Sequence, residues 1–143
     1  MRVLGSERLS SDLPYSTQWI EDEDVAAVIS VLKSGWLTQG PAIEAFEQAL
    51  AAECGAPHAI AVSSGTAALH LACLALGLSP GKRLVTSPLS FAASANCALY
   101  CGATPAFADV DPATGNMTPE ALSHALASGP AEVVVPVHFG GRP

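Results

Sequence analysis

Charge is scarce in this chain, and most of it is negative. Only 13% of the 143 residues are charged, and six Lys and Arg stand against 13 Asp and Glu, for a formal net charge of -7. Because nucleic-acid binding needs a basic patch, the shortage of Lys and Arg excludes that class of protein. Half of the residues are hydrophobic, which excludes a disordered chain and indicates one domain with a large buried fraction.

Cysteines are few, and long apolar runs are missing. The cysteines are Cys54, Cys73, Cys97 and Cys101, with no C-x-x-C pair among them. Their pattern favours small buried thiols in a reducing compartment over disulfides. The longest apolar run, 67–78, is too short to span a bilayer, and residues 1–11 lack the apolar core of a signal peptide. We therefore expect a cytoplasmic protein without a membrane segment.

The hydrophobic pattern alternates between strands and helices after residue 57. The predicted strands are 58–62, 83–87, 104–110 and 131–137, and the predicted helices are 22–34, 41–53, 66–76, 91–100 and 119–128. Residues 1–13 resemble a loose leader, followed by an extended segment at 14–20. The alternation predicts an α/β fold, a mostly parallel sheet with helices on both faces. Because 131–137 is almost wholly apolar, we expect that strand at the centre of the sheet, buried on both faces.

The turn Ser63–Thr66 is the strongest local signal. It joins a predicted strand directly to an apolar helix, so the first N–H groups of that helix lack helical partners. With the helix dipole, these groups form a pocket for a phosphate or another anion. A capped strand–helix junction without a ligand explains the same residues, and the turn alone does not separate the two interpretations.

Three further polar loops follow predicted strands. They are 87–91, 109–111 and 138–141. In parallel sheets the carboxyl ends of the strands share one edge, where ligands bind. This convergence favours a ligand site over a plain junction at Ser63–Thr66.

Five motifs occur in the order of a known family. They are Trp36–Pro41, Ser64–His70, Ser90–Asn96, Gly102–Pro105 with Asp109–Asp111, and Pro136–Gly141. In these motifs the chain resembles the DegT/DnrJ/StrS sugar aminotransferases, over about Leu13 to Pro143. The resemblance implies pyridoxal 5'-phosphate (PLP) as cofactor. It also implies that 14–143 is the N-terminal portion of the large domain of the aspartate-aminotransferase fold (PLP fold type I), truncated before a catalytic lysine and a C-terminal small domain.

The resemblance also implies roles for single residues. Backbone N–H groups of Gly65, Thr66 and Ala67 would hold the cofactor phosphate. Phe91 would stack on the pyridine ring, although a core aromatic that begins a helix is the alternative.

Four more residues are candidates for the substrate or the pocket. The loop with Thr38 and Gln39 would reach the substrate or a partner subunit, against a plain helix-capping role. Asp109 would shape the cofactor pocket, against a solvated turn acid. His138 would lie near the pocket, against a satisfied loop histidine. We expect Asp111 to serve turn chemistry alone.

One branch of the family is resembled most, through Pro14–Ile20 and Leu99–Gly102. That branch transfers an amino group to the 4-keto carbon of a UDP-linked 4-keto-6-deoxy-N-acetylhexosamine on the way to pseudaminic acid. It implies a nucleotide-sugar substrate, an amino-acid donor such as glutamate, and a homodimer. A PLP-dependent sugar dehydratase and a non-catalytic phosphate-binding fragment are the alternatives.

Lysine is nearly absent, and this limits the chemistry. Transamination needs a lysine that holds the cofactor covalently and moves the proton between carbon centres. Lys33 and Lys82 are the only lysines, and neither matches the family's position. We assign no catalytic residue and no metal ligand, and we expect that this chain does not transaminate alone.

Overall fold

The computed structural model describes residues 17–143, which divide into two compact units at Ala61 and Val62. The predicted leader and the first part of the extended segment lie outside the described residues. Each unit is described by itself. None of the helices in residues 17–143 combines the length and apolarity needed to cross a membrane.

The first unit contains two helices, α1 (Asp22–Lys33) and α2 (Pro41–Glu53). Helix α1 begins where the N–H of Glu21 donates to Asp24 Oδ2 at 2.9 Å, one half of a capping box. Helix α2 begins at a proline, which suits the first helical position. Both predicted helices are confirmed, but neither contains a buried residue.

The segment 58–62 was expected to be a strand, and this prediction is wrong. It forms no strand, and no strand among the described residues pairs with it. Ile60 is 79% exposed, and the N–H of Ala61 donates to Glu47 Oε1 of α2 at 2.7 Å instead of to a sheet. Apolar side chains favour a strand, but a strand also needs a neighbouring backbone to pair with.

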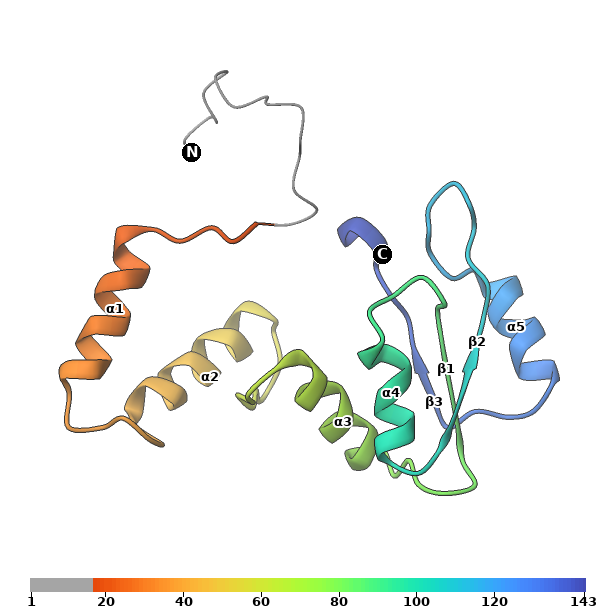
Figure 1. Ribbon diagram of the computed structural model, residues 1–143, viewed down its shortest axis with the longest axis horizontal. Coiled ribbons are helices and arrows are strands. Elements are labelled where there is room, and N and C mark those ends of the chain that lie inside the picture. Colours follow the sequence, from red (N-terminus) through yellow and green to blue (C-terminus); the bar gives the residue numbers. More distant parts are fainter. Residues whose placement is uncertain (1–16) are drawn as a thin grey trace, which may run out of the picture. The chain divides into compact units, whose positions relative to one another are not determined.

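The second unit is built around a three-stranded parallel sheet (Figure 1). Its strands are β1 (Arg83–Thr86), β2 (Thr104–Phe107) and β3 (Val133–Val135), in the order β2-β1-β3. Its α-helices are α3 (Gly65–Ala75), α4 (Ala93–Tyr100) and α5 (Pro119–Ala127), and a 3₁₀ turn, η1 (Phe139–Gly141), follows β3. In register, Leu84 lies opposite both Pro105 and Val133.

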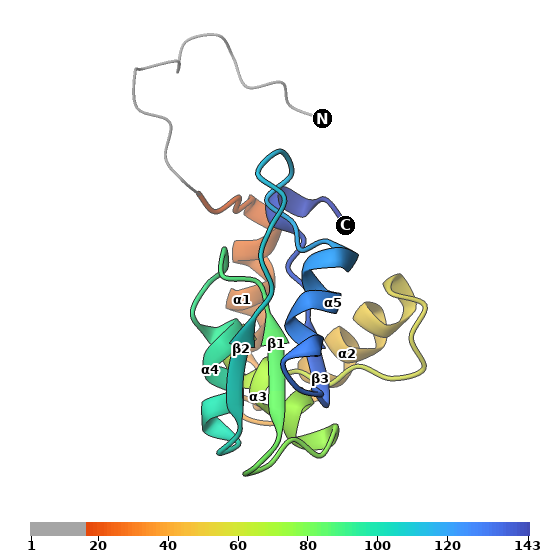
Figure 2. The same cartoon turned by 90° about the vertical axis from the view of Figure 1, so that its right-hand side faces the viewer.

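Helices cover both faces of this sheet, as predicted (Figure 2). Leu84 packs in one cluster with Cys97 of α4 and Cys73 of α3. Its neighbour Val85 packs in a second cluster with Ala125 of α5. Because successive side chains of a strand point to opposite faces, these two clusters lie on opposite sides of β1.

The predicted central position of the last strand is wrong. Among the described strands β1 is central, and β3 pairs only with β1. Val134 is 37% exposed, so β3 is not buried on both faces. An apolar run indicates burial but does not fix the strand order, which depends on the crossover connections.

Arg83 ties the start of β1 to the end of α5. Its guanidinium donates to the carbonyl of Ala125 at 3.0 Å, to Ser128 Oγ at 3.0 Å and to the carbonyl of Gly129. A cation that satisfies the last carbonyls of a helix also stabilises the negative end of its dipole. This contact fixes the position of α5 on its face of the sheet.

All four cysteines are free thiols, but not all are buried. Cys73, Cys97 and Cys101 lie in the core between α3, α4 and the sheet. Cys54 is exposed at the end of α2, so the prediction that it is buried is wrong. Because α2 packs no residue into a core, its C-terminal thiol has nothing to cover it.

Candidate functional site

The start of α3 has amide groups that donate to no other described residue. Ser64 caps the helix, since its Oγ accepts from the N–H of Ala67 at 3.1 Å and its carbonyl accepts from the N–H of Ala68 at 3.0 Å. In the described chain the N–H groups of Gly65 and Thr66 have no hydrogen-bond partner. They lie at the positive end of the helix dipole, an arrangement suited to an anion.

Gly65 stands beside open space. A Cβ built on it would meet no heavy atom within 4 Å, and its φ is not in the left-handed region. The backbone and its surroundings therefore do not require glycine here, and glycine costs helical stability. Close approach of a ligand to the backbone is a physical reason for glycine at this position, so these residues fit a bound phosphate.

The loop after β1 lines a cavity of about 350 Å³. The lining residues are Ser87, Pro88, Ser90, Phe91, Ala92, Ser94, Ala95, Asn96 and Phe107. Phe91 is 78% exposed and precedes the first residue of α4, so it is not a core aromatic and that alternative is wrong. An uncovered phenyl ring at a cavity is available to stack on a planar ligand.

The loop base is held by local hydrogen bonds. Buried Ser87 accepts the N–H of Leu89 on its Oγ at 3.2 Å. The hydroxyls of Ser90 and Ser94 are 2.7 Å apart, which ties the loop to α4. These bonds fix the backbone on both sides of Phe91.

The acids after β2 hydrogen-bond within their own loop. Asp109 is exposed, and its Oδ1 accepts from the N–H of Val110 at 2.8 Å. Asp111 accepts from the N–H of Ala113 at 3.0 Å and from Thr114 Oγ1 at 3.1 Å, which is the turn chemistry predicted for it. Asp109 is not part of the cavity lining at Phe91.

His138 lies immediately before η1, in the loop after β3. It is exposed, and its carbonyl accepts from the N–H of Gly141 at 3.0 Å. Sequence reasoning missed its neighbour across the sheet edge, Asn116, whose side chain bonds to residues 139 and 142. The only sequence signal was an asparagine in a predicted turn, which suggests local rather than distant bonds.

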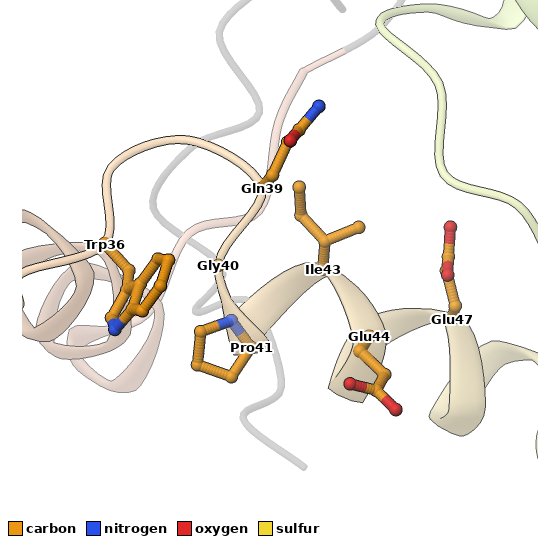
Figure 3. Close-up of a pocket in the computed structure, with 7 residues that line it drawn as sticks. All are labelled: Trp36, Gln39, Gly40, Pro41, Ile43, Glu44 and Glu47. Atoms are coloured by element: carbon orange, nitrogen blue, oxygen red, sulfur yellow. The ribbon is translucent and has the colours of Figure 1, made fainter.

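The first unit has a cavity of its own at the loop before α2 (Figure 3). Its volume is about 360 Å³, and it is lined by Trp36, Gln39, Gly40, Pro41, Ile43, Glu44 and Glu47. Gln39 is exposed with φ +50°, and Thr38 is exposed beside it. A Cβ on Gly40 would come within 2.8 Å of Trp36 Cβ, so this loop requires glycine at that point.

The one lysine of the second unit, residues 62–143, does not reach the carboxyl edge of the sheet. Lys82 lies in the turn before β1, at the opposite edge, and its Nζ donates to the carbonyl of Gly77 at 2.8 Å. Lys33 ends α1 in the first unit. Among the residues described, no group of three or more His, Cys, Asp or Glu is arranged to hold a metal ion.

The parallel sheet covered on both faces, with a capped helix start and polar loops at the strand ends, has the predicted α/β class of the PLP fold type I enzymes. Residues 18–143 match the DegT/DnrJ/EryC1/StrS aminotransferase family. The chain belongs to this family, as its motifs predicted.

Three similar proteins illustrate the relationship. The spore coat polysaccharide biosynthesis protein SpsC of Bacillus subtilis is 48% identical over 91% of this chain. The aminotransferase PseC of Helicobacter pylori, involved in pseudaminic acid biosynthesis, superposes with TM-score 0.79 at 35% identity over 91% of this chain and 35% of its own. The sugar aminotransferase Spr1654 of Streptococcus pneumoniae, in its PLP form, gives TM-score 0.73 at 30% identity over 79% of this chain and 29% of its own.

The chain spans about a third of the length of the relatives that it matches, 33% for SpsC. The features described above are therefore those of this portion.

Proposed function

We propose that this chain supplies the phosphate-holding and ring-holding part of a PLP site in a sugar aminotransferase. The observation that carries the proposal is the pair of N–H groups at Gly65 and Thr66, which have no hydrogen-bond partner within residues 17–143, with open space beside Gly65. A related protein has been solved in a PLP form, which supports this choice of anion.

Each residue has a physical task in this proposal. The N–H groups of Gly65 and Thr66 donate to the phosphate oxygens, and the dipole of α3 favours the phosphate charge. The N–H of Ala67 donates to Ser64 Oγ, so Ala67 would support the phosphate mainly through the dipole at the start of α3. Phe91 would hold the pyridine ring of the cofactor by stacking and would keep water away from it. PLP, when bound, acts as an electron sink for the substrate carbanion.

The proposed substrate is a nucleotide-linked 4-keto-6-deoxy sugar, with the amino group transferred to its 4-keto carbon. We propose a UDP-linked N-acetylhexosamine and a 4-amino-4,6-dideoxy-N-acetyl-altrosamine type of product, as the family resemblance implies. The likeness to PseC, an aminotransferase involved in pseudaminic acid biosynthesis, supports this pathway. The likeness to a spore coat polysaccharide protein supports a place in surface-glycan biosynthesis. We propose glutamate as the amino donor and a homodimer as the working form. We also propose the cytoplasm as the location, which the four free thiols support. Asp109, His138 and the Thr38–Gln39 loop remain proposals for contacts to substrate, pocket or partner subunit.

The ring-stacking role is tested by Phe91→Ala. Because Phe91 is 78% exposed, we expect its removal to leave the unfolding midpoint nearly unchanged and to weaken PLP binding by about tenfold. The measurement is a PLP titration followed by absorbance. Phe46→Ala, which removes an exposed aromatic of the first unit, is the matched control and should bind like the unchanged chain. Equal affinity in the Phe91→Ala and Phe46→Ala variants contradicts the assignment.

A further inference from the structure

Asn116 links two loops that are far apart in the sequence. Its Oδ1 accepts from the N–H of Phe139 at 2.8 Å, and its Nδ2 donates to the carbonyl of Arg142 at 3.0 Å. The acceptor and the donor of this one amide side chain thus both bond to the segment that begins at His138. A side chain with two such bonds is held in one orientation, and it fixes its partner loop in return.

The loop that carries Asn116 is itself braced. Val110 and Met117 form an antiparallel bridge, and the N–H of Asp111 donates to the carbonyl of Asn116 at 3.0 Å. The N–H of Asn116 donates to Thr114 Oγ1 at 3.2 Å. The backbone of Asn116 is therefore held in place by hydrogen bonds within its own loop.

Packing at Gly115 brings a third loop into the same contact. A Cβ on Gly115 would lie 2.9 Å from Phe139 Cδ1 and 3.3 Å from Leu89 Cδ2, and its φ is +73°. Leu89 belongs to the loop that carries Phe91. Glycine is required at this position for two reasons: two side chains approach its Cα closely, and its backbone is left-handed.

The strand order gives this contact its position. Because β2 and β3 flank β1, a link between the loops after β2 and β3 crosses the end of β1. The loop with Phe91 starts at that end. Three strand-end loops are thus joined at the edge where a ligand of a parallel sheet binds.

We propose that Asn116 is a positioning residue that holds the His138 loop over the end of β1 and so keeps the cofactor site in its binding geometry. The proposal rests on the PLP function proposed above. Asn116 itself touches no reacting atom in this account; it acts through Phe139 and Arg142.

The test compares three variants of the 143-residue chain by amide hydrogen exchange and by PLP titration. Asn116→Ala removes both bonds, and Asn116→Asp keeps only the acceptor for the Phe139 N–H. The control is Glu120→Gln, which changes an exposed side chain at the start of α5. We expect exchange at Phe139 to rise about tenfold in Asn116→Ala and to stay near the original rate in Asn116→Asp and Glu120→Gln. Exchange at Leu84 and Val85, in the core, should not change in any variant.

PLP affinity provides the second readout. We expect Asn116→Ala to bind PLP about five- to tenfold more weakly, with partial rescue in Asn116→Asp. Unchanged exchange at Phe139 in Asn116→Ala overturns the proposal, as does increased exchange with undiminished PLP affinity. Equal acceleration at Leu84 and Val85 would reveal general destabilisation and overturns it too. If the unchanged chain binds no PLP, the proposed function fails, while exchange at Phe139 still decides whether Asn116 holds the loop.

Discussion

At the scale of single residues, a substitution at Gly65 is expected to change PLP binding and the free energy of unfolding in opposite directions. Its backbone adopts no left-handed conformation and its Cβ position is empty, so alanine fits there without strain. We expect Gly65→Ala to raise the free energy of unfolding by about 0.5–1 kcal/mol, because alanine restricts the unfolded chain and favours the helix. The same methyl group would stand where the phosphate approaches, so PLP binding should weaken at least about tenfold.

The measurement for Gly65→Ala combines urea unfolding with a PLP titration. Gly35→Ala is the control, since a Cβ there also meets no heavy atom within 4 Å but lies in the first unit. It should leave PLP affinity unchanged. A Gly65→Ala variant that is more stable and binds PLP normally would refute the phosphate site at α3.

The sequence predicted side-chain hydrogen bonds only where donor and acceptor lie close together in the chain. The Ser64 cap and the Asp111 turn both involve partners within three residues, and both follow from side-chain type and spacing. The bonds of Asn116 span 23 and 26 residues, so no local pattern predicts them. The exposure of Phe91 likewise depends on where α4 begins, which spacing predicted two residues too early.

At the scale of elements, the packing of α3 against α4 makes the free energy of unfolding depend on pH. Burial raises the pKa of the Cys73 thiol from 9.0 to about 12, helped by the neighbouring Cys97 and Cys101. Below pH 9 the thiol is protonated in the folded and the unfolded chain, and its stabilising contribution is fully present. Above pH 9 the unfolded chain loses this proton while the folded chain keeps it, so stability falls as the pH rises toward 12.

We expect the free energy of unfolding to decrease by up to about 1 kcal/mol from this thiol between pH 9 and 10. Urea unfolding at a series of pH values measures the slope. Cys73→Ala should flatten it, whereas Cys54→Ala, which changes an exposed thiol, should keep it. An equal slope in the unchanged chain and in Cys73→Ala would show that Cys73 does not titrate in this way.

Most elements were predicted because each is encoded within its own segment. Helices α1, α2 and α5 follow from acidic first turns, prolines at their starts and apolar spacing. The failures are those of pairing. The segment 58–62 has the side chains of a strand but no partner among the described strands, and β3 has the composition of a central strand at an edge position. Pairing depends on other parts of the chain, which a local pattern does not contain.

At the scale of the whole chain, the proposed binding groups of the second unit lie apart from the lysine of that unit. The carboxyl edge of the sheet carries three loops, a cavity and an exposed phenyl ring, but Lys82, the one lysine of the second unit, lies at the opposite edge. The α/β fold class and the family were predictable because the motifs recur in order along the chain. Within residues 62–143, no lysine lies at the carboxyl edge of the sheet.

We propose that this chain recognises PLP through the phosphate group of the cofactor. It is tested most directly by titrating the 143-residue chain with PLP and with pyridoxal, which differ only in the phosphate. Two charge-assisted hydrogen bonds from Gly65 and Thr66, with the dipole of α3, predict that PLP binds at least about tenfold more tightly than pyridoxal. Equal affinity for the two compounds, or no saturable binding of PLP, would contradict the account.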